Sequence, residues 1–316
     1  MRFKISKRPN LSKFMVYIIF VFVLVIFAIW LGPTFFSTAN IMNITRQSGA
    51  TAVMAVSMVF VIGMGHIDLS IGSVVALSAM IISLILQSTG NIALALLGGL
   101  GMGAFVGFVN GMAVVKVKIP AFLATLGTQS IIRGIAMWTT KTKAVPITKE
   151  SFNFWFGSGN VAGIPVLLIW TIAALVISAF ALNYTPYGKR VMATGGNYSA
   201  AKYSGVKVER LTVIVFAVMG AVSALAGALF AGRMNTARWS YGEGVEMDVI
   251  AAVVLGGTSM AGGNGSAVGA IIGAILINMI NNGLVIGGFD TAQQTMMKGI
   301  IILLAVGLGS IGNKKR

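Results

Sequence analysis

Long apolar runs recur along this 316-residue chain, and they constrain its fold more than any other feature. A helix needs about 20 predominantly apolar residues to cross the roughly 30 Å hydrocarbon core of a bilayer. About ten such runs are present, near residues 14–31, 47–64, 69–86, 92–115, 119–138, 163–182, 211–233, 246–261, 266–286 and 294–311. With 57% hydrophobic and 9% charged residues, the composition is that of a membrane protein. We therefore expect an all-α, polytopic membrane protein with about ten transmembrane helices.

The basic residues are distributed unevenly between the loops. If the N-terminus is cytoplasmic, fifteen of the 23 Lys and Arg residues fall on the cytoplasmic side. This is the positive-inside pattern, so the net charge of +16 is explained by membrane topology. We expect the lipid bilayer as a partner and no nucleic-acid partner. We predict cytoplasmic tails at 1–13 and 312–316, a single transmembrane domain at 14–311, and a long cytoplasmic loop at 183–210. The first run ends in Trp30 and Leu31 without a small-residue cleavage site, so it is read as a retained helix.

Several classes of activity lack their sequence signature. The chain has no cysteine, which excludes disulfides and thiolate chemistry, and one histidine, which gives no metal-ligand cluster of plausible spacing. No G-x-x-x-x-G-K-[ST] sequence is present, so the chain cannot hydrolyse ATP unaided. We expect no enzyme activity, no metal and no cofactor bound by this chain.

Two similar glycine-rich motifs interrupt the apolar runs, GMGHIDLSIGSV at 63–74 and GGTSMAGGNGSAV at 256–268. An offset of 193 places Gly63 on Gly256 and Gly72-Ser73 on Gly265-Ser266. Internal repeats and helices broken by glycine are typical of transporters. The count of runs predicts parallel repeats, or inverted repeats if the short run near 246–261 does not cross. Chance is the alternative, because the chain has 40 glycines.

Each motif is expected to end one helix and restart another. In the first, Asp68, Ser70 and Gly72 fit a cap that opens the next helix, with the Asp68 carboxylate accepting free amide N–H groups at a hydrated membrane boundary. In the second, the break and cap residues are Gly256, Gly257 and the run from Gly263 to Gly265. Glycines spaced by four, such as Gly103 and Gly107, indicate close helix packing rather than ligand contact.

Polar residues within the apolar runs are candidates for a translocation path. They are Asn110, Gln129, Arg133, Asn278, Asn281, Asn282 and Lys298. Polar side chains in membranes also bridge helices, so either role fits. Asn110, Arg133 and Asn282 are the candidates we favour, because an arginine inside a membrane must find a partner or a water-filled cavity.

The loop at 183–210 contains a short predicted helix. Gly195-Gly196 is a break, Asn197 is suited to cap the next helix, and YSAAKYSG ends at Gly205. Such a helix serves as a solvated connector, a surface-lying amphipathic segment, or a contact for a separate motor protein.

The chain resembles the ribose-type permease subunits of bacterial carbohydrate ABC importers, within the branched-chain amino acid and ribose permease superfamily. GHIDLSIGS at 65–73, YGKRVMATGGNYSAAKYSGVKV at 187–208 and EMDVIAAVVLGGTSMAGGNGSAVGAIIGAILINMINNGL at 246–284 carry this resemblance. It extends over roughly residues 40–311. One departure is His66, where the family commonly has glycine; we interpret it as a neutral interfacial histidine.

The resemblance implies a permease in the bacterial plasma (inner) membrane that transports a monosaccharide. Its implied partners are a cytoplasmic ABC ATPase that binds the ATP, an extracytoplasmic sugar-binding protein, and a second permease subunit. The residues implied to contact the ATPase are Gly195, Gly196, Asn197, Ala200, Ala201 and Gly205. The loop 139–162, with FNFWFGSG at 152–159, is implied to help receive the binding protein.

Other functions remain open from the sequence. An ion-coupled secondary transporter fits the repeat, the broken helices, Asp68 and His66. Within the ABC class, the cargo is a ribose-like or other simple sugar, a nucleoside, a furanone-type signal or a branched-chain amino acid.

Overall fold

The computed structural model describes residues 11–313. Its long helices are α1 (Leu11–Leu31), α3 (Thr38–Gly63), α4 (Ile71–Thr89), α5 (Ile92–Met112), α6 (Ala121–Thr140), α8 (Val166–Tyr184), α11 (Val208–Met234), α13 (Ala267–Ile286) and α14 (Thr291–Asn313). The shorter elements are α2 (Pro33–Phe36), η1 (Ala113–Val117), α7 (Glu150–Asn153), η2 (Phe154–Ser158), α9 (Pro186–Gly196), α10 (Tyr198–Tyr203) and α12 (Val245–Leu255). Two-residue strands pair antiparallel as β1 (Val145–Pro146) with β4 (Thr236–Ala237), and β2 (Asn160–Val161) with β3 (Ile164–Pro165).

The prediction of an all-α polytopic membrane protein is confirmed. Six described helices are long and apolar enough to cross a membrane: α3, α4, α5 with η1, α8, α11 and α13. The other four predicted runs coincide with α1, α6, α12 and α14, and the count of about ten crossings stays a prediction. The predicted tails at 1–13 and 312–316 lie largely outside the described residues, and α1 already begins at Leu11.

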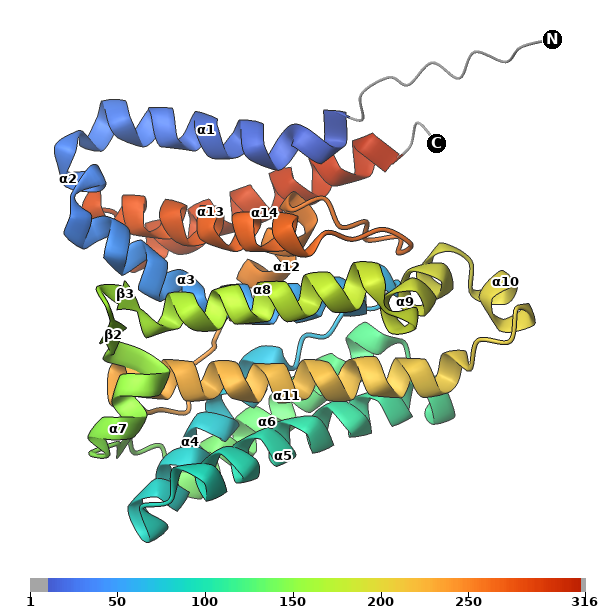
Figure 1. The fold of residues 1–316 in the computed structure, drawn as a ribbon, viewed down its shortest axis with the longest axis horizontal. Coiled ribbons are helices and arrows are strands. Elements are labelled where there is room, and N and C mark those ends of the chain that lie inside the picture. The colour runs from blue at the N-terminus through green and yellow to red at the C-terminus, as the bar shows by residue number, and fades with distance from the viewer. Residues whose placement is uncertain (1–10, 314–316) are drawn as a thin grey trace.

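The long helices lie side by side, and their ends define two ends of the molecule (Figure 1). We name these the α9–α10 end and the β2–β3 end, after the elements found there. Helix α1 begins and α14 finishes at the α9–α10 end (Figure 1). The described part of the chain therefore leaves the bundle on the side on which it enters.

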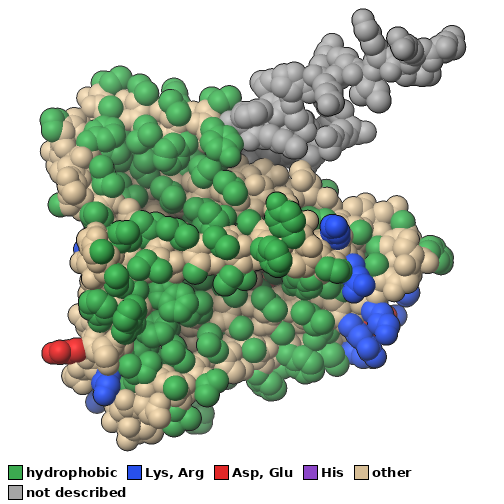
Figure 2. All heavy atoms as spheres, in the orientation of Figure 1, with side chains coloured by type: hydrophobic (Ala, Val, Ile, Leu, Met, Phe, Trp, Pro, Cys, Tyr) green, Lys and Arg blue, Asp and Glu red, His purple; other side chains and the backbone are tan. Residues whose placement is uncertain are grey.

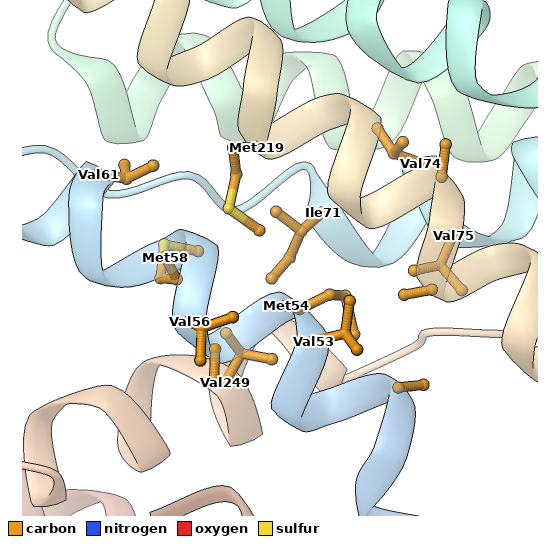
Figure 3. Close-up of a cluster of buried hydrophobic side chains, with 14 of the residues drawn as sticks. Val53, Met54, Val56, Met58, Val61, Ile71, Val74, Val75, Met219 and Val249 are labelled. Carbon is orange, nitrogen blue, oxygen red and sulfur yellow. The ribbon is translucent and has the colours of Figure 1, made fainter. Parts of the chain in front are cut away.

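Helix α4 begins beside the middle of α3 rather than at either end of the bundle. Figure 3 shows Ile71, the first residue of α4, next to Met54 and Met58 of α3 and Val249 of α12, in the buried core. The non-helical residues 64–70 thus run from the end of α3 into the centre of the protein. Irregular backbone at this depth is tolerated because protein surrounds it.

The second half of the chain repeats this arrangement from the opposite end. Residues 235–244 follow α11 into the centre, where α12 begins at Val245. Helix α12 has 11 residues, about 16 Å of rise, which is too short to cross a membrane. At the centre, Gly72 of α4 lies against Gly242, and a Cβ on either glycine would collide with the carbonyl oxygen of the other.

Helix packing relates α3–α6 to α11–α14 as an inverted pair. Helix α4 packs on α5 and α6 as α12 packs on α13 and α14, and α11 packs on α4 and α5 as α3 packs on α12 and α13. The direction is opposite, because Arg233 at the end of α11 donates from Nη1 to the carbonyl oxygen of Arg46 near the start of α3, at 3.5 Å. The count of runs left parallel and inverted repeats open, and this packing favours the inverted alternative. The pairing differs from that of the offset of 193, because packing matches the α3–α4 junction with the α11–α12 junction rather than with the α12–α13 junction. Helix α12, at 11 residues, is too short to cross by itself, which is what the inverted alternative required.

Glycines in the helices serve close packing, as the sequence indicates. A Cβ at Gly103 would collide with the carbonyl oxygen of Gly220, and one at Gly107 with that of Phe216. Helices α5 and α11 approach each other here backbone to backbone.

Candidate translocation and coupling sites

A group of polar side chains lies on α6, on the start of α12 and the segment before it, and on α14. We call it the polar face, and it consists of Gln129, Arg133, Glu243, Glu246, Asp248 and Lys298. Glu246 and Asp248 are buried in the first turn of α12, whereas Glu243 is exposed just before it. Three hydrogen-bonded connections anchor members of this group, two by joining members to each other and one by binding backbone.

The first connection runs from α6 to the segment before α12. Arg133 donates from Nη1 to the carbonyl oxygens of Trp239 and Tyr241, the latter at 2.8 Å. Its guanidinium also lies within electrostatic range of Glu243 and Glu246. Arg133 thus holds the non-helical segment before α12 by donating to two of its backbone carbonyl oxygens.

The other two connections anchor α12. Gln129 donates from Nε2 to Glu246 Oε1 at 3.0 Å, and Lys298 of α14 pairs with Asp248 Oδ2 at 3.0 Å. The second carboxylate oxygen of Glu246 is buried without a hydrogen-bond partner among the described residues. Lys298 keeps 35% of its side chain exposed, so the group reaches the surface of the bundle.

Lipid is an unfavourable neighbour for this surface. A charged side chain at the centre of a bilayer costs about 2.5–3.5 kcal/mol or more. The exposed residues of α6 near this group include three small ones, Gly127, Ser130 and Gly134, beside exposed Leu126 and Ile131. A water-filled path or another protein surface is the environment that suits such a mixture of charge and small residues.

Asp68 lies in a second polar network, on the extended segment 64–70. Its Oδ1 accepts the Ser70 amide at 2.8 Å and the Ser70 hydroxyl at 2.6 Å. Asn110 donates to Ser70 Oγ at 2.9 Å and accepts from the Thr128 hydroxyl at 2.7 Å. Asp68 is 1% exposed, so the predicted hydrated boundary position is wrong, because the segment folds inward before α4 begins.

The second motif caps its helix at a different residue from the one predicted. Ser266 Oγ accepts the Gly269 amide at 3.0 Å and caps α13, rather than the residues from Gly263 to Gly265. Gly256 follows the last turn of α12, and Gly257 takes a φ of +89° that favours glycine. A Cβ at Gly256 would collide with the backbone of Gly269, so Gly256 is required by close packing and Gly257 by its backbone conformation.

Asn282 is hydrogen-bonded to Asn40, outside the polar face. Its amide exchanges two hydrogen bonds with Asn40 at the start of α3, each at 3.0 Å. This reciprocal pair bridges α13 to α3 and uses one donor and one acceptor of each amide. The geometry favours a structural role for Asn282 over a place in the path.

The segment 183–210 is more helical than the sequence indicates. Gly195 and Gly196 form the last turn of α9 rather than a loop. Asn197 then adopts an extended conformation, and its Oδ1 caps α10 by accepting the Ala200 amide at 2.9 Å. Ala201 is buried and Ala200 is exposed, while Gly205 has a φ of +85° after α10. Helix α10 thus presents one face outward, at the α9–α10 end (Figure 1).

The two glycine motifs and α9 meet at one point, which we call the glycine junction. A Cβ at Gly195 would overlap the carbonyl oxygen of Gly63 and would press on the amide nitrogen of Gly263 at 2.7 Å. The Gly263 amide itself donates to the Gly63 carbonyl oxygen at 2.9 Å. Helix α9 is therefore in direct contact with the ends of both segments that lead into α4 and α13.

Comparison with known proteins fits this architecture. Residues 40–306 match the family described as branched-chain amino acid transport system / permease component. The chain belongs to this permease family. It is 42% identical over 288 residues to the ribose import permease protein RbsC of Bacillus subtilis, covering 90% of this chain and 89% of that protein.

Two further relatives extend the comparison. The permease is 38% identical over 290 residues to the ribose import permease protein RbsC of Escherichia coli K12, covering 90% of this chain and 89% of the relative. It is 33% identical over 274 residues to the L-arabinose transport system permease protein AraH of the same strain, covering 87% and 83%. No solved structure matches the permease.

At the β2–β3 end, the segment 139–162 of the permease is folded against α11. Gly157 packs on Gly232 so closely that a Cβ would collide with its backbone, and Phe152 is fully buried. From FNFWFGSG, Phe154 and Trp155 remain exposed, at 39% and 53%. With Trp138 in the last turn of α6, 83% exposed, these rings contribute to an aromatic surface at this end.

Sequence reasoning missed Glu246 and Asp248 as site residues. A signal was present, because three of the chain's seven acidic residues, Glu243, Glu246 and Asp248, fall within six positions just before an apolar run. His66, by contrast, is half-buried with its ring 5.8 Å from that of Phe216.

Proposed function

We propose that the permease is the transmembrane subunit of an ABC importer and forms the translocation path for a monosaccharide, ribose-like or another simple sugar. An extracytoplasmic binding protein delivers the sugar, and a separate cytoplasmic ATPase drives its passage. The ribose and arabinose permeases among the relatives support this cargo class. In this proposal both termini and the α9–α10 end face the cytoplasm of a bacterial cell.

The glycine junction is the observation that carries the proposal. Helix α10 exposes Ala200 and follows α9 directly, and Gly195 of α9 packs without a gap on Gly63 and Gly263. A motor protein that moves α10 therefore moves the segments that enter α4 and α13. The described residues contain no nucleotide-binding motif, so the driving protein is a separate chain.

The polar face supplies half of the path. Its amide, guanidinium and carboxylate groups can exchange hydrogen bonds with sugar hydroxyl groups, and Glu246 Oε2 is an acceptor without a partner within the described part of the chain. A second permease subunit, placed against the exposed side of α6, where small and apolar residues alternate, would close this open surface into a path. The relay through Asp68 and Asn110 lies beside it and holds α4, α5 and α6 in register.

The test is uptake of labelled pentoses and hexoses into vesicles that carry the permease, its candidate ATPase and its binding protein. The Ala200→Glu variant places a charge on the exposed face of α10, and Thr291→Glu places the same charge on the exposed first turn of α14. We expect uptake to require ATP, to fall by at least tenfold in Ala200→Glu, and to remain near the wild-type rate in Thr291→Glu.

Both variants should reach the membrane in equal amounts. Uptake that runs on an ion gradient without the ATPase would replace this proposal with a secondary transporter, and Asp68 and His66 would then be the residues to test. Uptake of a nucleoside or a branched-chain amino acid but no sugar would keep the ATP-driven mechanism and overturn the cargo.

A further inference from the structure

A small groove lies where α10 joins α11, outside the glycine junction and the polar face. Its volume is about 280 Å³, and Tyr198, Lys202, Lys207 and Arg210 are among the residues that line it. Tyr198 and Lys202 are four positions apart on α10 and so share one helix face. The three basic side chains are exposed and converge on one space from two helices and the turn between them.

The positive charge of this groove is not neutralised by neighbouring side chains. Glu209 is the one acidic residue that lines it. Within residues 11–313 the one ion pair is that of Lys298 with Asp248, far from this end. Further basic residues lie on the neighbouring helix ends, namely Lys116, Lys118, Lys189 and Arg190. Figure 2 shows basic side chains gathered at this end of the molecule.

The start of α11 adds hydrogen-bond donors to the groove. This 27-residue helix begins at Val208 without a side-chain cap. The Val208 amide donates to the carbonyl oxygen of Val206 at 2.8 Å, which leaves the next amides of the first turn, those of Glu209 and Arg210, without a capping side chain among the described residues. An anionic oxygen in the groove would accept from these amides and pair with the lysine and arginine side chains. A phosphate group has the size, charge and number of acceptors that this donor set requires.

The surroundings indicate that the phosphate belongs to a lipid. Helix α11 becomes apolar at Leu211, directly after Arg210 of the groove, so the groove lies at the polar boundary of a membrane. Tyr184, Tyr198 and Tyr203 are 76%, 52% and 92% exposed at the same end, as is typical of side chains at lipid headgroup depth. Val206 and Val208 provide apolar lining beside the cations.

We infer that this groove binds the phosphate of an anionic phospholipid headgroup, held by Lys202, Lys207 and Arg210. The bound lipid would lie between the base of α10 and the first turn of α11. Its charge would hold α10 against the membrane surface, which makes the lipid a second partner of the helix that the ATPase is proposed to contact.

The test measures binding of phosphatidylglycerol and phosphatidylcholine to the purified full-length permease by native mass spectrometry. Each basic residue near an anionic membrane surface contributes about a fivefold gain in affinity. The triple variant Lys202→Gln, Lys207→Gln, Arg210→Gln should therefore bind phosphatidylglycerol on the order of 100-fold more weakly. The matched control, Lys141→Gln, Lys143→Gln, Lys149→Gln, removes three exposed charges at the β2–β3 end and should bind as the wild type does. Lys207→Arg should also retain binding.

Three outcomes would overturn the inference. One is equal phosphatidylglycerol affinity in the two triple variants. Another is binding of inorganic phosphate with no preference for phosphatidylglycerol over phosphatidylcholine, which would make the groove a site for the free ion. The last is loss of ATPase association in the α10–α11 variant with unchanged lipid affinity, which would assign the groove to the partner protein.

Discussion

The amide of Gly263 donates a hydrogen bond to the carbonyl oxygen of Gly63 across 2.9 Å, although 200 residues separate them in the chain. This bond joins the end of α3 to the loop before α13. Gly195 of α9 packs against both residues. A displacement of α9 therefore reaches both halves of the inverted pair at one point.

Gly195→Ala should uncouple transport, because its methyl group would overlap the Gly63 carbonyl oxygen. We expect ATP-driven uptake to fall by tenfold or more while the permease still inserts in the membrane. The matched control is Gly196→Ala, whose Cβ would have its nearest neighbour at 3.7 Å, an ordinary contact. Equal uptake by the two variants would contradict a tight junction at Gly195.

Arg133→Ala should destabilise the permease as well as slow transport. It removes a charged donor from the carbonyl oxygens of Trp239 and Tyr241, and such bonds contribute about 1.5–3 kcal/mol. We expect a drop of several degrees in the thermal midpoint of the purified protein. Ser130→Ala, on an exposed position of the same helix, is the control and should leave that midpoint unchanged. A lowered midpoint in both variants would point to α6 itself rather than to the arginine.

Lys298→Met should impair transport more than the double change Lys298→Met with Asp248→Asn. The single variant leaves the buried Asp248 carboxylate without its cation at 3.0 Å, whereas the double variant removes both charges. Uptake rates and the amount of folded protein would be compared for the two. If the double variant is the more impaired, the lysine and the aspartate act separately on the cargo.

Asn40→Ala and Asn282→Ala should show coupled effects on stability. The two amides exchange hydrogen bonds at 3.0 Å, and interhelical polar contacts in membranes average about 0.6 kcal/mol each. A double-mutant cycle should therefore give a coupling energy of about 1 kcal/mol, with the sugar concentration for half-maximal uptake unchanged. Asn278→Ala is the control, since the bond that its amide makes among the described residues is to the Ala274 carbonyl oxygen of its own helix. A selective change in that sugar concentration would return Asn282 to the path.

The sequence was sufficient for the helical class, the positions of the apolar helices and the capping of α10 by Asn197. Each depends on local periodicity or on a cap that acts within one helical turn. It was insufficient for the inward course of 64–70 and 235–244, because apolar length does not record the depth at which a helix begins. Asp68 was misplaced for this reason. Its burial depends on Ser70, Asn110 and Thr128, which only the tertiary packing brings together.

The contact of Gly72 with Gly242 bears on how the two halves of the chain can be exchanged between relatives. Each glycine occupies the space that a side chain at the other would need, so the two positions form one compatibility requirement shared by distant segments. A chimera that joins residues from one permease through α6 to the α11–α14 half of another should assemble only where both parents keep glycine at these positions. A recombination point between the two halves therefore has to preserve glycine at both Gly72 and Gly242, because the contact is made by one residue from each half.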